Sequence, residues 1–357
     1  MSRFFTSKYS NLVPYTPGEQ PKDRKFVKLN TNESPFPTME CAVEAGRLAA
    51  ENAQLYSDPE CTYFREALAK RFNVTPDMVI AVNGSDEILN FAFMAFCDES
   101  CPALFPDITY GFYPVFANLS HLPYKTFPLN DDFTIDIEPY KNTFGTVVIA
   151  NPNAPTGIAL PLSKIEEIVA SNPDRVVIVD EAYVDFGTES ALLLVPKYPN
   201  LLVTQTFSKS RSFAGGRLGF GIAQPELIAD LNTLRYSTNP YNVNSITLAM
   251  GKAILENDDE TVRRCSVIAE NREWTHRELE RLGFVHTPSK ANFIFARHPE
   301  ASGDEIYKKL REKGVLVRHF TAERICEYNR ITVGSREQME ILIKSLEEIL
   351  EEKNVRS

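Results

Sequence analysis

A lysine flanked by two serines lies in the stretch TFSKSRSFAGGRLGF, which continues the apolar run LLVTQTF. A lysine between serines is ordinarily a solvated surface residue. Directly after a buried strand, however, Lys209 would lie in a desolvated site, where its amine loses pKa from about 10.4 and becomes a nucleophile for an aldehyde. Arg217 follows beyond a Gly-Gly pair, and its fork of donors, together with Ser208, suits a phosphate. GGRLGF lacks the G-x-G-x-x-G spacing of a dinucleotide loop, so we exclude that interpretation.

A second candidate anion site lies in the stretch VNGSDEILNFAF (residues 82–93). Gly84 permits a tight turn after a strand, and Ser85 or Asp86 would cap the helix that follows. The free N–H groups at such a helix start bind anions. An ordinary capped helix has the same pattern, so this stretch alone does not establish a site.

A buried acid is predicted in VVIVDEAYVDF, where Asp180 ends an otherwise apolar strand. A carboxylate there is costly unless it meets a positive partner, and a protonated ring nitrogen would be one. A helix cap or an exposed strand end is the alternative. Tyr183 lies three residues further on, so its hydroxyl either enters the same space or its ring simply packs.

Together these groups match one ligand. The helix start with Ser208 and Arg217 would hold a phosphate, Asp180 would meet a ring nitrogen, and Lys209 would condense with an aldehyde. Pyridoxal phosphate carries all three of these groups.

The elements that would position these groups alternate between strand and helix. Short apolar runs lie at residues 78–82, 146–150, 175–180, 201–207 and 217–223, and they are separated by loops or by amphipathic stretches such as SKIEEIVASN. This alternation predicts an α/β fold, with a mostly parallel central sheet and helices on both faces. Ligands of such sheets bind beyond the carboxyl ends of the strands, where the candidate residues lie.

A smaller α+β domain is expected after this pattern ends. SITLAMGKAILEND and DETVRRCSVIAENREWTHRELERLG have apolar steps typical of helices, and Gly283 would end the second one as a left-handed cap. ANFIFAR and GVLVRHF are predicted strands, while DEIYKKLREKG and REQMEILIKSLEEILEEK are predicted helices. The proline-rich start predicts an extended arm. We therefore expect an N-terminal arm over residues 1–35 that joins the small domain, a large domain over 36–244 and a small domain over 245–357.

Composition excludes several other classes. The 357 residues carry a net charge of −10, which argues against nucleic acid and anionic membranes as partners. We find no apolar run long enough for a membrane helix and no signal peptide at the start of the sequence. The six scattered cysteines indicate buried thiols in a reducing cytoplasm, and neither they nor the five histidines have metal-ligand spacing, so no metal is expected.

Eight motifs in order carry a family resemblance. They are LNTNESPFP (29–37), YSDPE (56–60), NGSDEIL (83–89), ITYGFY (108–113), NPNAPTG (151–157), VDEAYVDF (179–186), TFSKSRSFAGGRLGF (206–220) and RITVG (330–334). With them the sequence resembles, over nearly its whole length, the fold-type I pyridoxal-phosphate aminotransferases, and within them the histidinol-phosphate aminotransferase family. The resemblance implies a PLP-binding large domain and an active homodimer.

The resemblance also implies roles for matching residues. Lys209 would bind the cofactor aldehyde and move protons, Asp180 would pair with the ring nitrogen, and Tyr183 would bond the ring oxygen. Tyr110 would stack on the ring, unless it is a core tyrosine. The implied phosphate ligands are Gly84, Ser85, Asp86, Thr206, Ser208 and Arg217, joined by Tyr56 from the other subunit.

One position departs from the family pattern. The family has Asn immediately before Pro-Thr-Gly, facing the ring oxygen, whereas this sequence has Ala154 there and Asn153 one place earlier. Either Asn153 takes over this role or Tyr183 holds the ring oxygen alone.

The resemblance implies transamination of L-histidinol phosphate with 2-oxoglutarate, which gives imidazole-acetol phosphate and glutamate in histidine biosynthesis. Arg330 would bind a substrate carboxylate, and with Arg318 it would suit a phosphate dianion. Tyr15 and Asn32 match positions that approach the substrate. Alternatively, Arg318 is a surface strand residue and Tyr15 is an anchor of the arm.

An aromatic amino-acid aminotransferase or a threonine-phosphate decarboxylase would share much of the site. A regulatory protein that binds the cofactor without turnover is a third class, and the intact Lys209 and Asp180 argue against it.

Overall fold

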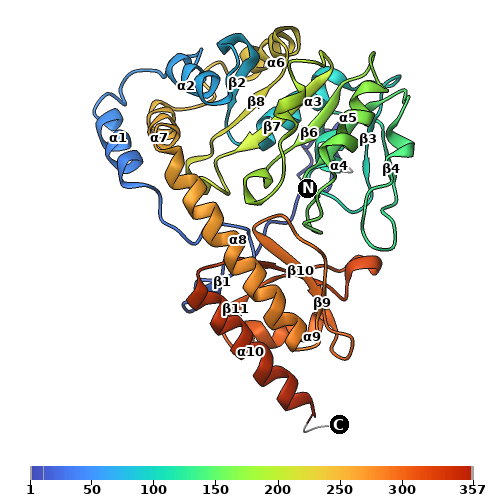
Figure 1. The fold of residues 1–357 in the computed structure, drawn as a ribbon. Coiled ribbons are helices and arrows are strands. Elements are labelled where there is room, and N and C mark those ends of the chain that lie inside the picture. The colour runs from blue at the N-terminus through green and yellow to red at the C-terminus, as the bar shows by residue number, and fades with distance from the viewer. Residues whose placement is uncertain (1, 11, 355–357) are drawn as a thin grey trace.

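The apolar runs expected as strands lie side by side in one sheet of the computed structural model, which describes residues 2–10 and 12–354 (Figure 1). Within these residues the sheet has the strand order β2-β8-β7-β6-β5-β3-β4. Its strands are β2 (Val79–Val82), β3 (Ala103–Pro106), β4 (Tyr124–Phe127), β5 (Thr146–Ala150), β6 (Val177–Asp180), β7 (Leu201–Thr206) and β8 (Gly219–Ile222). The five expected runs are confirmed, and β3 and β4 are additional strands.

The sheet is mostly parallel, as expected. Strands β4, β3, β5, β6 and β7 pair in parallel, whereas β8 is antiparallel to both β7 and β2. Parallel strands bring their carboxyl ends to one edge of the sheet, so the residues that follow β5, β6 and β7 meet there.

Helices cover both faces of the large sheet because alternate strand residues point to opposite sides. Val147 and Ile149 of β5 belong to one apolar cluster, and Val148 and Ala150 belong to another on the opposite face. The helices preceding the small domain are α1 (Glu40–Ala50), α2 (Thr62–Phe72), α3 (Ser85–Phe96), α4 (Tyr113–Leu119), α5 (Leu162–Ala170), α6 (Pro225–Thr238) and α7 (Ser245–Leu255). The predicted α/β class is thus confirmed.

A smaller antiparallel sheet with the order β12-β13-β10-β9 lies beside the large one, among α8, α9 and α10 (Figure 1). Its elements are α8 (Asp258–Arg281), β9 (Val285–His286), β10 (Phe293–Arg297), α9 (Gly303–Glu312), β12 (Arg318–His319), β13 (Asn329–Thr332) and α10 (Arg336–Asn354). Gly283 follows α8 with φ +83°, which confirms the predicted left-handed cap.

The N-terminal arm joins this smaller part. Strand β1 (Val27–Lys28) pairs in parallel with β11 (Val315–Leu316), and Leu29 belongs to the apolar cluster of the smaller sheet. The start of the arm is less extended than expected, because Ser7–Tyr9 forms a 3-10 turn capped by Thr6. Further 3-10 turns lie at Pro76–Met78, Glu138–Tyr140, Val184–Phe186, Ala191–Leu194, Ala214–Gly216 and Glu323–Ile325.

The packing of α7 differs from the expected division after residue 244. This helix packs against α1 and α2, and its Ile254 and Leu255 belong to the core of the large sheet. We therefore propose that the large domain includes α7 and that the small domain begins with α8. In the part of the chain that the structure describes, no helix is long and apolar enough to cross a membrane.

Candidate active site

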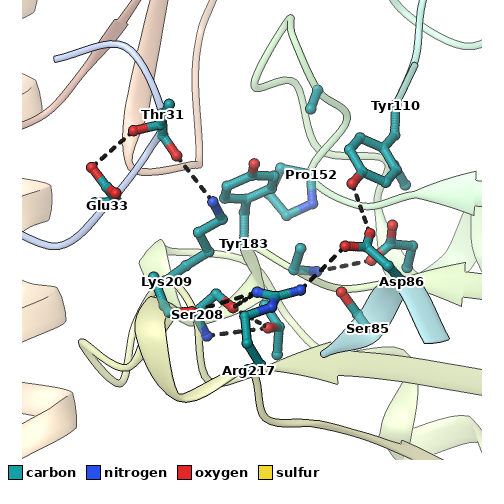
Figure 2. Close-up of a pocket in the computed structure, with 16 residues that line it drawn as sticks. Thr31, Glu33, Ser85, Asp86, Tyr110, Pro152, Tyr183, Ser208, Lys209 and Arg217 are labelled. Atoms are coloured by element: carbon teal, nitrogen blue, oxygen red, sulfur yellow. Dashed lines mark hydrogen bonds and ion pairs between the residues drawn. The ribbon is translucent and has the colours of Figure 1, made fainter. Parts of the chain in front are cut away.

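A cavity of about 230 Å³ opens at the carboxyl ends of β5, β6 and β7, where the sheet topology brings the candidate residues together (Figure 2). Asp180, Lys209, Arg217, Ser85, Asp86 and Tyr110 line it. A second cavity of about 370 Å³ shares Thr31, Tyr110, Ala154, Tyr183 and Lys209 with the first, so the two form neighbouring compartments around the lysine.

Lys209 lies in the turn after β7, and its Nζ donates a hydrogen bond of 3.1 Å to the carbonyl oxygen of Thr31 in the N-terminal arm. Burial lowers the pKa of Lys209 to about 8, and the positive charge of Arg330 acts in the same direction. A much larger share of this amine than of an ordinary lysine is therefore neutral near physiological pH, as a nucleophile requires.

Asp180 ends β6 and is buried, and its Oδ2 accepts a hydrogen bond of 2.9 Å from the hydroxyl of Tyr113. The backbone N–H of Ala182 donates to Oδ1 at 3.3 Å. Burial raises the pKa of Asp180 to about 6, while the hydroxyl of Tyr113 acts in the opposite direction. The carboxylate is thus held ready to receive a positive group in a place with little water.

An anion cradle, formed by Ser85, Asp86, Ser208 and Arg217, lies at the start of α3. The Arg217 guanidinium donates to Ser208 Oγ at 3.3 Å and forms an ion pair with Asp86 at 3.3 Å. Ser85 and Asp86 line the cavity at the first turn of α3, and the N–H groups at a helix start are suited to an anion.

Gly84 lies next to this cradle, and Thr206 lines the cavity beside it. Gly84 has φ +76°, and a Cβ built there would lie 2.5 Å from Arg217 Nη2, so a larger residue would displace the guanidinium. The hydroxyl of Thr206 donates to Ser208 Oγ at 3.0 Å and accepts from the Ser208 N–H at 3.1 Å. Both residues therefore fix the neighbours that line the cavity.

Two tyrosines border the cavity with their hydroxyls engaged. The Tyr110 hydroxyl donates to Asp86 Oδ1 at 2.7 Å, and the Tyr183 hydroxyl accepts from Asn32 Nδ2 at 3.0 Å. Lys209 Nζ lies 5.9 Å from the centre of the Tyr183 ring, so the amine lies between this ring and the Thr31 carbonyl of the arm (Figure 2). Burial raises the pKa of Tyr183, which keeps its hydroxyl protonated and able to donate as well.

Asn153 is not brought into the cavity, which corrects one of the two alternatives for the ring oxygen. Its Oδ1 accepts from Thr109 at 2.7 Å, and its Nδ2 donates to the Ile108 carbonyl at 2.9 Å and to Thr156 at 3.2 Å. The buried amide is occupied by these loop contacts, whereas Ala154 lines both cavities. Tyr183 is the predicted partner that remains beside this position.

The second cavity contains the predicted substrate residues. Arg318 and Arg330 are direct cross-strand neighbours on β12 and β13, and both line the cavity. Each guanidinium donates to a carbonyl of the arm, Arg318 to Thr16 at 3.3 Å and Arg330 to Asn30 at 3.2 Å. Tyr15 lies on the arm with its ring 4.8 Å from that of Phe112.

Asn32 makes contacts with Thr332 and Tyr183 that the sequence does not predict. It is buried in the left-handed region, with φ +57°, and Thr332 binds both its backbone N–H and its Oδ1. Because its Nδ2 donates to Tyr183, Asn32 contacts a second predicted site residue. Its side chain therefore ties the arm to the active-site tyrosine.

Tyr56 is not brought to either cavity within the chain. Its side chain is 84% exposed and stacks on Tyr241, with ring centres 4.6 Å apart. The role expected for it needs a second copy of the chain.

Sequence analysis missed Tyr113 and the backbone of Thr31. Tyr113 belongs to the motif ITYGFY, and its position three residues after Tyr110 was the available signal. Thr31 acts through its carbonyl oxygen, which every residue type has, so no side-chain pattern could identify it. Glu33 also lines the first cavity, where it accepts from Lys28 at 2.5 Å and Thr31 at 2.8 Å.

This arrangement can hold a flat, anionic aldehyde by three separate groups: a cradle for the anion, a buried acid across the cavity, and an amine with lowered pKa between them. The second cavity can hold another anionic molecule next to the same amine.

Comparisons with known proteins agree with this geometry. A model of the family "Aminotransferase class I and II" matches residues 24–346. The sequence is 46% identical over 353 residues to a histidinol-phosphate aminotransferase of Clostridium botulinum, covering 98% of this chain and 99% of that protein. It is 47% identical over 350 residues to a histidinol-phosphate aminotransferase of Marinomonas sp., covering 97% and 99%.

Solved structures share the fold. A histidinol-phosphate aminotransferase of Sinorhizobium meliloti in complex with pyridoxal-5'-phosphate superposes with a TM-score of 0.89, at 22% identity over 99% of both chains. An L-threonine-O-3-phosphate decarboxylase of Porphyromonas gingivalis superposes with a TM-score of 0.79, at 22% identity over 91% of this chain and 99% of that one. At this identity the likeness shows the fold and not the reaction.

Proposed function

This chain belongs to the class I and II aminotransferases, and we propose that it transfers the amino group of L-histidinol phosphate to 2-oxoglutarate with pyridoxal 5'-phosphate as cofactor. The products are imidazole-acetol phosphate and glutamate, and the step belongs to histidine biosynthesis. Support for the substrate comes from the full-length relatives at 45–47% identity and from the paired arginines of the second cavity.

The residues of the first cavity fit this cofactor. The cradle of Ser85, Asp86, Ser208 and Arg217 would hold its phosphate, and a side chain at Gly84 would meet Arg217, which explains the glycine there. Asp180 would face the ring nitrogen, Tyr183 the ring oxygen and Tyr110 the ring face. When bound, the cofactor supplies an electron sink for the carbon that loses its proton.

Lys209 would accept and return a proton at its Nζ, beside the place where the cofactor aldehyde and the substrate would meet. Its amine has a pKa of about 8 because it is buried near a positive arginine, so the neutral base and its protonated form are both accessible near neutral pH. Lys209 Nζ lines both cavities, and it can therefore reach a molecule in either one.

Asp180 stabilises positive charge at its end of the cavity. The Tyr113 hydroxyl and the Ala182 N–H fix the direction of the carboxylate, so its charge is aimed before a ligand arrives. Burial strengthens the interaction of this carboxylate with a cationic ring nitrogen because little water screens it.

Arg318 and Arg330 select an anionic substrate. Two guanidinium groups present up to four parallel donors to a phosphate dianion, which one arginine beside a carboxylate does not provide. Tyr15 and Asn32 border the same cavity. Arg330 would take the carboxylate of 2-oxoglutarate in the other half of the reaction.

We also propose that the active unit is a homodimer in a reducing cytoplasm. Tyr56 projects away from its own cavities, so it would complete the anion cradle of a second copy. All six cysteines are free, in keeping with a reducing compartment.

The decisive experiment removes the amine. Purified protein should be yellow, with an absorbance band that borohydride reduction removes, and Lys209→Ala should lose both the reducible band and transamination. Lys197→Ala is the matched control, because Lys197 is an exposed lysine paired with Glu166. Full turnover by the Lys209→Ala protein would refute the mechanism.

A comparison of amino donors tests the substrate. L-histidinol phosphate should give a much higher kcat/KM than phenylalanine, and threonine phosphate should release no carbon dioxide. A strong preference for phenylalanine would still agree with an aminotransferase, but it would refute the proposal that Arg318 binds a substrate phosphate.

A further inference from the structure

Two surface loops present a pair of stacked tyrosines. Tyr56 lies in the loop before α2, and Tyr241 lies in the loop between α6 and α7. Their rings are 4.6 Å apart at an interplanar angle of 20°, and their side chains are 84% and 42% exposed. A stacked pair of this kind restricts the rotation of an otherwise free tyrosine.

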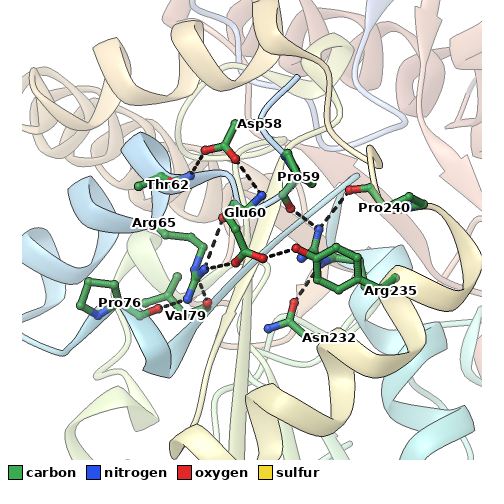
Figure 3. Close-up of polar contacts among 11 residues, drawn as sticks. Asp58, Pro59, Glu60, Thr62, Arg65, Pro76, Val79, Asn232, Arg235 and Pro240 are labelled. Carbon is green, nitrogen blue, oxygen red and sulfur yellow. Dashed lines mark hydrogen bonds and ion pairs between the residues drawn. The ribbon is translucent and has the colours of Figure 1, made fainter. Parts of the chain in front are cut away.

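A buried arginine joins the two loops from below (Figure 3). Arg235 of α6 is only 3% exposed, and its Nη1 donates to the carbonyl of Pro59 at 2.6 Å and to the carbonyl of Pro240 at 3.3 Å. Its Nε donates to Asn232 Oδ1 at 2.8 Å, which fixes the plane of the guanidinium. Pro240 adjoins Tyr241, and Pro59 lies three residues after Tyr56.

The base of the Tyr56 loop is held by further polar contacts. Asp58 accepts from the backbone N–H groups of Glu60 and Thr62 at 2.9 and 2.8 Å. The Glu60 carboxylate pairs with Arg65 at 2.9 Å and accepts from the hydroxyl of Tyr236 (Figure 3). The loop is therefore anchored at its base while its tyrosine stands in solvent.

Holding Tyr56 in place before it binds lowers the entropy cost of binding. A mobile tyrosine loses conformational freedom when it is captured by another molecule, and a tyrosine that is already held loses less. Arg235 contacts both loops at once, so it links the loop that carries Tyr56 to the loop that carries Tyr241. A lysine at this position has no planar fork and cannot reproduce the three bonds.

We propose that Arg235 is a positioning residue, which holds Tyr56 and Tyr241 as a preformed pair so that Tyr56 enters the anion cradle of a second copy. The inference rests on the proposed function, namely a homodimer whose cofactor phosphate receives the Tyr56 hydroxyl. Arg235 acts through Tyr56 and touches neither cavity.

A double-mutant cycle on the full-length enzyme tests this role. Tyr56→Phe should weaken pyridoxal phosphate binding to the cofactor-free protein about tenfold, as loss of one hydrogen bond to a charged group predicts. Arg235→Lys should weaken it at least about threefold when Tyr56 is present, and have little further effect in the Tyr56→Phe protein. Strictly additive effects of the two substitutions would overturn the proposal.

Arg272→Lys is the matched control. Arg272 is also a buried arginine that donates to two backbone carbonyls, those of Phe186 and Ala291, both at 2.9 Å. Arg272→Lys should change the affinity for pyridoxal phosphate by the same factor in the Tyr56→Phe protein as in the protein that keeps Tyr56. Equal coupling of Arg272 and Arg235 to Tyr56 would indicate a general effect of stability and would also overturn the proposal.

Tyr241→Ala provides a second variant if Arg235→Lys does not fold, because Tyr241 is a partly exposed loop residue. It should weaken pyridoxal phosphate binding when Tyr56 is present and not in the Tyr56→Phe protein, and additive effects would contradict the inference. If the proposed function itself were wrong, the unmodified protein would show no borohydride-sensitive band and no transamination. If only the positioning role of Arg235 were wrong, the unmodified protein would show both.

Discussion

Arg318 and Arg330 lie directly opposite one another on the antiparallel strands β12 and β13. Like charges in this position repel, so the pair costs stability in the absence of an anion. Burial lowers the pKa of Arg330, and the charge of Arg318 acts in the same direction. Within the described residues, Arg330 Nε is a buried donor without a partner. Each guanidinium also donates to a carbonyl of the arm, but the repulsion and the unpaired Nε favour an anionic ligand at this pair.

Replacement of one arginine should separate binding from stability. We expect Arg318→Gln to reduce kcat/KM for L-histidinol phosphate about 10- to 100-fold, as loss of a charged hydrogen bond predicts. The melting temperature should stay the same or rise, because the repulsion is relieved. Steady-state kinetics and thermal unfolding measure the two effects.

Arg297→Gln is the control for that experiment, since Arg297 lies on β10 of the same sheet and bonds Tyr328 at 3.2 Å. It should leave kcat/KM nearly unchanged. A parallel loss of activity and stability in Arg318→Gln would show that Arg318 serves the fold.

The lowered pKa of Lys209 predicts a pH dependence. Only the neutral amine attacks an aldehyde, and with a pKa of about 8 roughly one tenth of it is neutral at pH 7. The rate at which cofactor-free protein captures pyridoxal phosphate should rise through about pH 8 and level off above it. Stopped-flow absorbance measures this rate.

Removal of the positive charge nearby should move this midpoint to higher pH, because Arg330 helps to lower the pKa of Lys209. Arg330→Gln should show the shift, and Arg281→Gln, an exposed arginine on α8, should not. An unchanged midpoint in Arg330→Gln would show that Arg330 does not lower the pKa of Lys209, and would leave burial and the charge of Arg217 as its causes.

Tyr113→Phe removes the hydroxyl that stabilises the Asp180 carboxylate. Without it the pKa of Asp180 should rise above its value of about 6. As the pH is lowered, the Tyr113→Phe protein should therefore lose the cofactor at a higher pH than the unmodified protein does. We expect a shift of about one pH unit, since a hydrogen bond to a charged group contributes about 1.5 kcal/mol or more.

Titration of pyridoxal phosphate binding between pH 5 and pH 8 measures the shift. Tyr198→Phe is the control, because its hydroxyl bonds Glu166 at 2.9 Å, away from the cavities. Identical acid limits for Tyr113→Phe and the unmodified protein would show that the hydroxyl does not tune Asp180.

Gly84→Ala should weaken cofactor binding without unfolding the protein. The new Cβ would lie 2.5 Å from Arg217 Nη2, and φ of +76° with ψ of 159° is a region that essentially only glycine adopts, so the backbone strain adds about 1–3 kcal/mol. We expect the dissociation constant of pyridoxal phosphate to rise about tenfold or more, because a displaced Arg217 no longer donates to the phosphate.

Gly215→Ala is the matched control on the neighbouring loop, since a Cβ there meets no atom within 4 Å. It should leave the dissociation constant unchanged. Equal affinity of the Gly84→Ala and unmodified proteins for pyridoxal phosphate would show that Arg217 does not hold the phosphate in the anion cradle.

The sequence predicted the elements whose pattern is local. The strands ending at Asp180 and Thr206, and the glycine cap after α8, follow from apolar periodicity and turn chemistry. The antiparallel direction of β8 and the packing of α7 on α1 could not be predicted, because pairing between distant segments leaves no local signal.

The site shows the same division. Lys209, Asp180 and Arg217 were identifiable because charged groups beside buried strands need partners. Asn153 was assigned to the cavity from its place in a motif, yet the direction of its side chain depends on Thr109, which lies on another loop. Tyr113 begins α4 and is fully buried, whereas Tyr110 lies in the preceding loop, and the motif does not show which of the two tyrosines meets Asp180.

The hydrogen bond from Lys209 to the carbonyl of Thr31 has a mechanical consequence. Thr31 follows β1, which pairs with β11 beside the smaller sheet, whereas Lys209 follows β7 of the larger sheet. A rotation of one sheet against the other would stretch this contact, together with the bond from Asn32 to Tyr183. The amine of Lys209 would then lose its partner in the arm, so a change in the contact between the two sheets would act directly on the reactive group.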